Sequence, residues 1–268
     1  SALYDAERKL FAIGMDVDNG RLSRSHYDLL ASESRILSFT AMMLGQVPQR
    51  HWRKLGRPCA AAEGGAALVS WSGTMFEYLM PELLMPAPGP TLLGRSVREA
   101  LRAQRLQGAR LDRPWGVSES GCYAFDAALN YQYRAFGLPA LALSGEAVEG
   151  VVAPYASALA AVIDPGEAAR NLRRMRALGW AGEWGLYEAA DYLRPGPKGE
   201  PTVVKSHMAH HQGMILCALC NALTDDSLSG DFMEMPQARA LSLLLEEKTF
   251  CGHVLRRANA SRQRCVET

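Results

Sequence analysis

Apolar residues recur at helical spacing along most of this 268-residue chain. Between Ser25 and Leu44, pairs of apolar residues repeat every seven positions, and Ser25 is a residue type that caps helix starts. Similar spacing, bounded by glycine or proline, predicts eight further helices: Trp71–Met85, Val97–Gln107, Ala124–Phe136, Tyr155–Ile163, Pro165–Leu178, Gly185–Tyr192, His207–Leu223 and Gln237–Lys248.

Strand signals are few. Lys9–Val17 runs into Asp18-Asn19-Gly20, which is typical of a hairpin turn, and Ala66–Trp71 is the predicted partner strand. Many helices of similar length, joined by loops, predict an all-α fold with a minor β-hairpin, built as a toroid of paired helices.

The chain is short for a complete toroid of six helical hairpins, which needs on the order of 300 residues or more. It has 268 residues and starts abruptly in Leu3-Tyr4-Asp5. We therefore predict a single domain over residues 1–268 that lacks its first helix pair and is a fragment of a larger multidomain protein.

Charge and composition narrow the choice of partner. The chain has 29 Lys and Arg residues and 28 Asp and Glu residues, which leaves a formal net charge of +1. There is no excess of basic residues that would indicate nucleic-acid binding, so a neutral or small ligand is expected. No stretch reaches the ~18–20 apolar residues of a membrane span. We expect no direct membrane contact in this chain, so any membrane tether would lie outside it.

Six cysteines are present, and the spacing of Cys217 and Cys220 could serve a metal or a redox pair. Both lie in an apolar run, which favours two buried helix positions. Reduced, cytoplasmic conditions fit this pattern best.

Glu33 is a first candidate for chemistry. Its predicted helical neighbours are apolar, and a carboxylate buried among them must be paired, hydrogen-bonded or protonated. Two interpretations stay open. Glu33 forms a structural ion pair with Arg35 or Arg53, or it points into the mouth of the fold.

Two further glutamates lie beside small or aromatic residues. Glu77 follows a glycine and a threonine that leave room for a ligand, and Glu119 lies in a loop or helix start between Trp115 and Tyr123. Aromatic rings stack on sugar faces and desolvate a nearby carboxyl, which raises its pKa toward that of a general acid. A structural or solvated carboxylate is the alternative for each.

Glu188 and Asp191 are crowded by aromatic residues and would share one face of a predicted helix as i,i+3 neighbours. They bind substrate, or they cap or bridge buried polar groups. The candidate sugar platforms are five aromatic residues: Trp71, Trp115, Tyr123, Trp184 and Tyr187.

Histidines offer a competing chemistry. His207, His210 and His211 have a spacing that can present two imidazoles to a metal, but there is no HExxH and no third ligand is indicated. We therefore predict no metal and no cofactor. His210, His211 and Gln212 are assigned to hydrogen bonding with sugar hydroxyls, with core packing as the alternative.

Six phrases of the sequence resemble one known family, in the same order and over nearly the whole chain. They are Tyr27-Asp-Leu-Leu-Ala-Ser-Glu, Ser70-Trp-Ser-Gly-Thr-Met-Phe-Glu-Tyr-Leu-Met-Pro, Trp115-Gly-Val-Ser-Glu-Ser, Asn130-Tyr-Gln-Tyr-Arg-Ala-Phe-Gly, Val152-Ala-Pro-Tyr-Ala and Met208-Ala-His-His-Gln-Gly-Met. The family is the glycoamylase-like domain of cyclic β-1,2-glucan synthases. The sequence departs from it at His207, where the family usually has Tyr.

This resemblance implies an (α/α)6 toroid related to endo-β-1,2-glucanases. It implies that linear β-1,2-glucan is cleaved and transferred to its own non-reducing end. It also implies a membrane-anchored parent in which the domain works on the cytoplasmic side of the bacterial inner membrane. Glu33 and Glu119 match the family's catalytic carboxylates. Glu77 matches a carboxylate shared with the glucanases, with a catalytic or a substrate-binding part.

The resulting hypothesis makes Glu119 the general acid. Glu33 then either attacks the sugar directly or activates the acceptor hydroxyl. Two alternatives are simple hydrolysis of β-1,2-glucan and a non-catalytic glycan-binding module.

Overall fold

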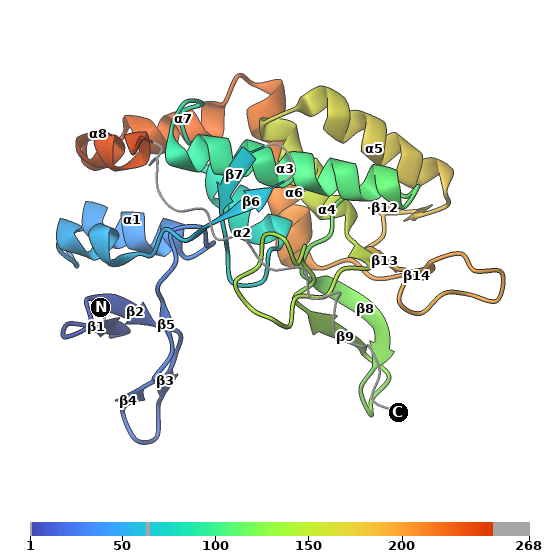
Figure 1. Cartoon of the computed structure of the whole chain (residues 1–268), viewed down its shortest axis with the longest axis horizontal. Helices are drawn as coiled ribbons and strands as arrows, with labels where there is room; N and C mark the ends of the chain where they lie inside the picture. The colour runs from blue at the N-terminus through green and yellow to red at the C-terminus, as the bar shows by residue number, and fades with distance from the viewer. Residues whose placement is uncertain (1, 63–64, 249–268) are drawn as a thin grey trace, which may run out of the picture.

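The computed structural model describes residues 2–62 and 65–248. Helices and strands alternate along this part of the chain (Figure 1). The α-helices are α1 Arg35–Met43, α2 Met75–Leu79, α3 Leu92–Arg110, α4 Pro154–Leu159, α5 Pro165–Ala177, α6 Ala209–Leu223, α7 Ser227–Glu234 and α8 Pro236–Leu241. Short 3-10 helices cover Gln49–Lys54, Met80–Leu83, Ala160–Val162 and Ser242–Glu246.

Fourteen short strands form six small sheets within the described residues. The strands are β1 Tyr4–Asp5, β2 Leu10–Ala12, β3 Met15–Asp16, β4 Arg21–Leu22, β5 His26–Tyr27, β6 Cys59–Ala62, β7 Gly65–Leu68, β8 Ser120–Phe125, β9 Tyr131–Arg134, β10 Val151–Val152, β11 Ala181–Gly182, β12 Gly185–Leu186, β13 Ala189–Asp191 and β14 Thr202–Val204. The sheets are β1-β2-β5, β10-β13-β14 and the pairs β3-β4, β6-β7, β8-β9 and β11-β12.

The prediction of an all-α (α/α)6 toroid with one minor hairpin is therefore wrong. Residues 124–136, predicted as a helix, form the end of β8, a turn and β9, because alternating aromatic residues favour a pleated strand. Residues 185–192 form β12 and β13 instead of a helix, and β13 pairs with strands on both sides. A helical spacing over so few residues does not exclude a strand whose partners are distant.

The helix predicted from Ser25 to Leu44 begins only at Arg35. Upstream of it, the Leu30 amide donates to the Gly56 carbonyl at 2.9 Å, and the Ser34 amide donates to the Ser32 hydroxyl at 3.2 Å. Serine hydroxyls compete with helical hydrogen bonds in this way. Glu33 consequently lies in a turn before α1, not on an apolar helix face.

The predicted hairpin turn at Asp18-Asn19-Gly20 connects β3 with β4. Its expected partner, Ala66–Trp71, is not part of that sheet. The segment Gly65–Leu68 pairs with Cys59–Ala62 instead. Closing a short local hairpin costs less conformational entropy than closing a loop of some fifty residues.

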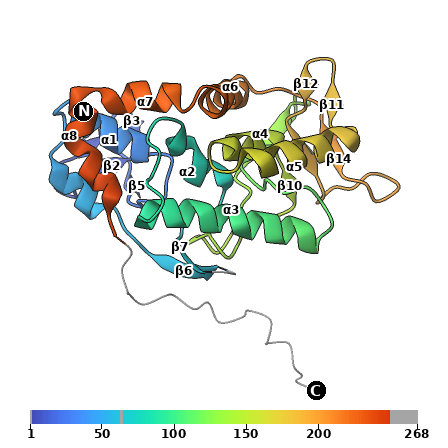
Figure 2. The same cartoon turned by 90° about the horizontal axis from the view of Figure 1, so that it is seen from above.

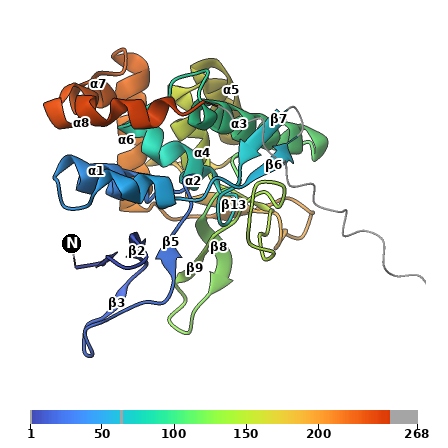
Figure 3. The same ribbon diagram turned by 60° about the vertical axis from the view of Figure 1, so that its left-hand side comes forward.

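In the view of Figure 1 the helices form the upper part of the molecule, and α3 and α5 run side by side (Figures 1 and 2). Two groups of strands extend below them: β1–β5 from the N-terminal segment and the long β8–β9 hairpin (Figures 1 and 3). No described helix combines the length and the apolar character needed to cross a membrane.

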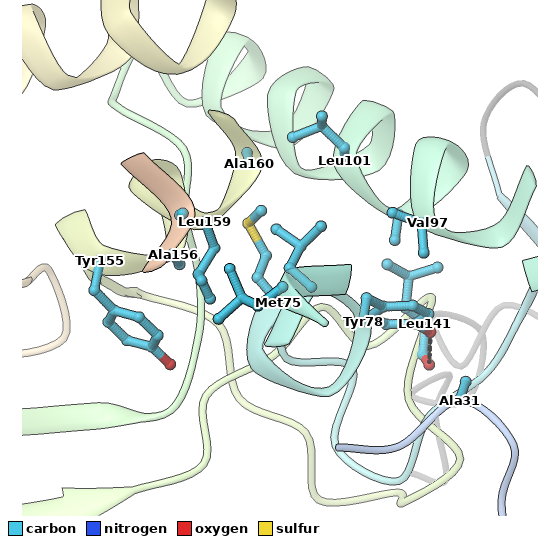
Figure 4. Packing of buried hydrophobic residues seen from close by; sticks show 14 of the residues in the cluster. Ala31, Met75, Tyr78, Val97, Leu101, Leu141, Tyr155, Ala156, Leu159 and Ala160 are labelled. Atoms are coloured by element: carbon cyan, nitrogen blue, oxygen red, sulfur yellow. Dashed lines mark hydrogen bonds between the residues drawn. The ribbon is translucent and has the colours of Figure 1, made fainter. Parts of the chain in front are cut away.

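The core lies where α2 packs under α3 and against α4 (Figure 4). Met75 and Tyr78 of α2 are buried there, opposite Val97 and Leu101 of α3. The Tyr78 hydroxyl donates to the Leu68 carbonyl at 2.7 Å and also lies 3.2 Å from the Leu141 carbonyl, which satisfies this polar group inside the core.

Cys59, Cys122, Cys217 and Cys220 are free thiols. The prediction that Cys217 and Cys220 are both buried on a helix is right only for the helix: both lie on α6, but Cys217 is half-buried and Cys220 is exposed. Cys251 and Cys265 lie outside the described residues.

A fully buried ion pair joins α1 to the segment after α2. Arg35 Nη2 donates to Glu82 Oε1 at 2.8 Å, and Glu82 Oε2 accepts from the Ala87 amide at 2.7 Å. Burial lowers the pKa of Arg35 and raises that of Glu82, although each group's charge favours the ionised form of the other. Because Arg35 pairs with Glu82, no ion pair with Arg35 fixes Glu33.

We expect Glu82→Gln to lower the free energy of unfolding by about 3–5 kcal/mol, because the Arg35 guanidinium would stay buried without its counter-charge. Urea denaturation measures this. The double variant Arg35→Met/Glu82→Leu should recover most of the loss. A cost below about 1 kcal/mol for the single variant would contradict the importance of this pair.

Candidate active site

One cavity of about 600 Å³ collects all three candidate glutamates. It lies between the N-terminal strands, the turn before α2 and the residue that precedes β8. Its lining residues are Arg8, Leu10, Ile13, Arg24, Ser25, His26, Tyr27, Asp28, Leu29, Ser32, Glu33, Trp71, Ser72, Glu77 and Glu119. Carboxylates that are 42 and 44 residues apart in sequence thus face one space of sugar size.

Glu77 is held by its own turn. Its Oε2 accepts from the Ser70 hydroxyl at 2.8 Å and from the Thr74 amide at 2.9 Å, and its Oε1 accepts from the Ser72 amide at 3.1 Å. Thr74 in return accepts from the Glu77 amide at 3.2 Å, which completes a capping box at the start of α2. This carboxylate is buried and fully engaged as an acceptor, so it is fixed in place.

The same turn carries Trp71, whose side chain is 60% exposed at the cavity. Gly73 has φ +71°, and a Cβ there would lie 2.5 Å from the Leu138 carbonyl, so only glycine fits. The Ser144 amide donates to the Trp71 carbonyl at 2.9 Å. The exposed indole therefore stands on a rigid backbone, as a stacking platform requires.

Glu33 lines the same cavity from the turn before α1. The Ser32 hydroxyl donates to Glu33 Oε2 at 3.0 Å, and no charged partner is recorded for this carboxylate in the described part of the chain. Burial raises its pKa, and the negative charges of Glu77 and Glu119 raise it further, against the opposing effect of its hydrogen bonds.

Glu119 precedes β8 and is also half-buried. The Tyr133 hydroxyl, from β9, donates to Glu119 Oε1 at 2.8 Å. Burial raises the pKa of Glu119 and the charge of Glu77 adds to this, while the Tyr133 hydrogen bond acts in the opposite direction. Two carboxyl groups with raised pKa values thus face one cavity, as acid–base chemistry requires.

A buried polar chain lies behind Glu119. The Tyr133 hydroxyl is 3.3 Å from His211 Nε2, and His211 Nδ1 is 3.0 Å from the Glu188 carboxylate. The His211 ring stacks on Tyr155 with centroids 3.6 Å apart. Glu188 and His211, predicted to bind substrate, therefore lie behind the cavity wall and reach it only through Tyr133.

Asp191 and Tyr123 are joined to each other away from the cavity. Asp191 is fully buried, and its Oδ2 accepts from the Tyr123 amide at 2.9 Å and from Arg194 Nη1 at 3.0 Å. Glu188 and Asp191 do not share a helix face, because residues 185–192 are extended. The Tyr123 ring packs on Phe125 in the β8–β9 hairpin.

The other predicted contacts also lie outside the lining of this cavity. Trp115 is buried in the core, where its carbonyl accepts from Asn171 Nδ2 at 2.8 Å. Trp184 is 79% exposed between β11 and β12, and Tyr187 packs near His207. On α6, His210 is exposed with its ring 6.1 Å from that of Tyr133, and Gln212 is half-buried.

Among the described residues, no group of three or more His, Cys, Asp or Glu side chains is placed to hold a metal ion. The helical spacing of His207, His210 and His211 does not converge on one point, since His211 points inward to Glu188 while His210 is exposed.

Sequence reasoning missed much of the cavity wall. Arg8, Arg24 and Asp28 line it from the N-terminal strands, and Tyr133 contacts Glu119 from behind. Asp28 and Tyr133 lie inside the family phrases, which is a signal that could have identified them. Arg8 and Arg24 carry no such signal, because only the folding of β1–β5 brings them to the cavity.

Comparison with known proteins places the chain in a family. The glycoamylase family model, described as "Putative glucoamylase", matches residues 25–236. The chain is 42% identical over 251 residues to the cyclic β-(1,2)-glucan synthase NdvB of Rhizobium meliloti (strain 1021), which covers 92% of the chain and 9% of that protein. The chain thus spans a small fraction of that synthase's length.

Solved structures with the same fold include two endo-β-1,2-glucanases. The enzyme from Chitinophaga pinensis, in complex with sophorotriose and glucose, has a TM-score of 0.68 at 14% identity and matches 91% of this chain and 61% of its own. A mutant of the Talaromyces funiculosus enzyme with β-1,2-glucan has a TM-score of 0.68 at 14% identity and matches 90% of this chain and 52% of its own. At such identities the likeness shows the fold alone.

The raised carboxyl pKa of Glu33 predicts a pH-dependent gain in stability for Glu33→Gln. Because the folded-state pKa lies above the unfolded value, the parent loses stability as pH rises through the window between the two values, and the amide does not. We expect a gain on the order of 1 kcal/mol near neutral pH that vanishes below about pH 4, the unfolded value for Glu.

Thermal unfolding of both proteins between pH 3 and pH 8 measures this. Glu183→Gln, at an exposed glutamate between β11 and β12, is the matched control and should show no such trend. A gain for Glu33→Gln that is constant across this range would contradict a raised pKa.

Proposed function

The chain belongs to the glycoamylase family, as its six family phrases predicted, and from this membership and the three-carboxylate cavity we propose that it cleaves linear β-1,2-glucan and rejoins it into a cyclic glucan. The observation that carries the proposal is that Glu33 and Glu119 line one cavity, where burial and neighbouring charges raise the pKa of each. Glycoside bond cleavage needs one protonated carboxyl group as the acid and one ionised carboxylate as the nucleophile or base. A pair that shares one cavity supplies both, because the like charges disfavour ionisation of both groups at once.

Glu119 acts as the general acid. Its half-buried carboxyl holds a proton at a higher pH than a solvated one, and Tyr133 fixes one of its oxygens so that the other can face the glycosidic oxygen. Glu33, which lines the same cavity, attacks the sugar or activates the acceptor hydroxyl. A carboxylate separation of ~5–5.5 Å favours direct attack, and one of ~6.5–9.5 Å leaves room for the acceptor or water.

Glu77 contributes a carboxylate that is held in one orientation. Its oxygens accept hydrogen bonds from Ser70, Ser72 and Thr74, which favours a positioning and electrostatic part over attack on a sugar. Its charge raises the pKa values of Glu33 and Glu119, and it suits the positive charge that develops on the sugar ring in the transition state.

Neutral glucan fits the remainder of the cavity. The exposed Trp71 offers one apolar face for stacking, and Arg8, Arg24 and Asp28 offer donors and acceptors for hydroxyl groups. Of the aromatic residues that do not line this cavity, Tyr123, Trp184 and Tyr187 would bind sugar only on a longer glucan that extends beyond it. Trp115 is buried in the core and has no face free for a sugar.

Cyclisation and hydrolysis differ only in the group that accepts the cleaved sugar. The 42% identity to a cyclic β-(1,2)-glucan synthase supports cyclisation, whereas the shared fold with endo-β-1,2-glucanases keeps hydrolysis as the second candidate. A glycan-binding module without turnover is the third, and the paired carboxylates argue against it.

We also propose that residues 1–268 act as one domain of a larger membrane-anchored protein, on the cytoplasmic side of the bacterial inner membrane. The match of nearly the whole chain to 9% of a synthase supports a larger parent protein, and the membrane anchor and the cytoplasmic side follow from the family resemblance alone. Expression of the parent protein with a protease-accessible tag on this segment would locate it.

Incubation of the chain with linear β-1,2-glucan, followed by mass analysis, tests the proposed reaction. A cyclic product has the mass of its linear counterpart minus water. We expect Glu33→Gln and Glu119→Gln each to lower the rate at least about 10²-fold while the proteins stay folded, because each variant removes a proton-transfer or nucleophilic group. Glu183→Gln should keep the parental rate.

The outcomes separate the candidates. Linear short products alone would select hydrolysis, and glucan binding without any product would select the binding module. A near-parental rate for either active-site variant would remove that residue from the mechanism.

We expect Trp71→Ala to raise KM for β-1,2-glucan by roughly 2- to 12-fold, the range that corresponds to about 0.5–1.5 kcal/mol of lost stacking. Initial rates over a range of glucan concentrations measure this. Trp184→Ala removes an indole that is also exposed, at 79% against 60% for Trp71, but lies outside the cavity, and it should change KM less. Equal effects of the two variants would contradict the platform role of Trp71.

A further inference from the structure

A chain of hydrogen-bonded side chains lies behind Glu119. It runs from Glu119 through Tyr133 and His211 to Glu188, with successive contacts of 2.8, 3.3 and 3.0 Å. Three of its members come from separate elements, β9, α6 and the residue before β13. His211 is fully buried and Glu188 almost so, which means that water does not complete their hydrogen bonds.

The Glu188 carboxylate fixes the tautomer of His211. One Glu188 oxygen accepts from the Gly121 amide at 3.1 Å and the other faces His211 Nδ1. Because an ionised carboxylate can only accept, Nδ1 carries the imidazole proton. In the neutral ring Nε2 is then an acceptor directed at the Tyr133 hydroxyl.

Tyr133 thus has one proton and two acceptors. When Glu119 is ionised, the Tyr133 hydroxyl donates to Glu119 Oε1, as the 2.8 Å contact shows. A proton that rests on Oε1 is donated to Tyr133, and the Tyr133 proton then turns to His211 Nε2. A proton on Oε2, the oxygen that faces the glycosidic bond, leaves the Tyr133 donation to Oε1 in place. Neither arrangement adds or removes a proton from Tyr133 or His211, since only the hydroxyl rotates.

We propose that Tyr133 is a positioning residue for Glu119, and that His211, held by Glu188, gives the Tyr133 proton its second resting place, so that Glu119 keeps a hydrogen-bonded partner in both of its protonation states. This inference rests on the proposed function, in which Glu119 gives up a proton and regains it. A group that cycles in this way would otherwise have to reorganise its surroundings at each step.

Packing holds the hydrogen-bonded chain from Glu119 to Glu188 rigid. The Tyr155 ring stacks on His211 at an interplanar angle of 11°, and its hydroxyl donates to the Glu119 carbonyl at 2.9 Å. Tyr155 therefore fixes both the His211 imidazole and the backbone of Glu119. With ring and backbone locked, the Tyr133 hydroxyl rotor is the part that is left to move.

Other charged and titratable groups also face Glu119, and they set the background for a pH experiment. Glu77 comes from α2, Glu33 from the turn before α1 and Tyr27 from β5. From the other side come the groups of the chain itself, Tyr133 and His211. Among the described residues, Glu77, Glu33 and Tyr27 make no hydrogen bond to Tyr133. A substitution at Tyr133 therefore leaves their electrostatic effect on Glu119 in place.

The test is Tyr133→Phe in the whole chain. Loss of the hydroxyl removes a charge-assisted hydrogen bond from ionised Glu119 and only a neutral one from its protonated form, so the ionised form loses more. We expect the high-pH limb of the rate profile to move upward by about one pH unit and kcat to fall on the order of tenfold or more, with KM nearly unchanged. Tyr131→Phe, on the same strand, should leave the profile as in the parent.

A readout without turnover accompanies it. The carbon-13 shift of the Glu119 carboxyl, followed against pH, should show a higher midpoint in Tyr133→Phe than in the parent. His211→Gln should alter the profile of the parent but add little in the Tyr133→Phe background, because its effect passes through that hydroxyl.

These results separate the inference from the function on which it rests. If Glu119→Gln is inactive while Tyr133→Phe keeps the parental kcat, profile and carboxyl midpoint, the inference is overturned and the proposed function stands. If Glu119→Gln keeps the parental rate, the catalytic assignment fails first. Additive effects of the Tyr133 and His211 variants would overturn the coupling between them.

Discussion

The hydrogen bonds to the Glu77 carboxylate constrain the rest of the site. A carboxylate that is 6% exposed needs donors, and the turn from Ser70 to Thr74 supplies them from two amides and two hydroxyls. This requirement bends the chain into one conformation, starts α2 and presents Trp71 to the cavity. Backbone hydrogen bonds also join this turn to residues 138–144. The Glu77 carboxylate and this loop therefore stabilise the same conformation of the turn.

The fixed charge has a chemical consequence. Glu33 and Glu119 are half-buried beside it, and both therefore hold protons more tightly than solvated carboxyls do. Three acidic groups around one cavity destabilise the fold unless they are paired or protonated. The fully buried ion pair of Arg35 with Glu82 lies outside the lining of this cavity.

The fold divides the work between two kinds of element. The helical layer, with α2 packed under α3 and against α4, supplies the core and fixes the starts of α1, α2 and β8. The small sheets below it carry the polar groups of the cavity wall and the β9 tyrosine that holds Glu119. The proposed catalytic groups thus lie on turns anchored in a rigid layer, which gives precision without burying them completely.

By itself, the sequence determined the features that depend on neighbouring residues. The Thr74 and Glu77 spacing specifies a capping box, and Asp164 followed by Pro165 specifies the start of α5. It also identified Glu33, Glu77, Glu119 and Trp71, because these lie in phrases specific to one family. Only the tertiary structure decided the rest. Residues 124–136 and 185–192 are strands because their hydrogen-bond partners lie elsewhere in the chain, and Trp115 is buried because α5 packs on its loop. The contact between Tyr133 and His211 joins residues 78 positions apart, and no local pattern encodes such a distance.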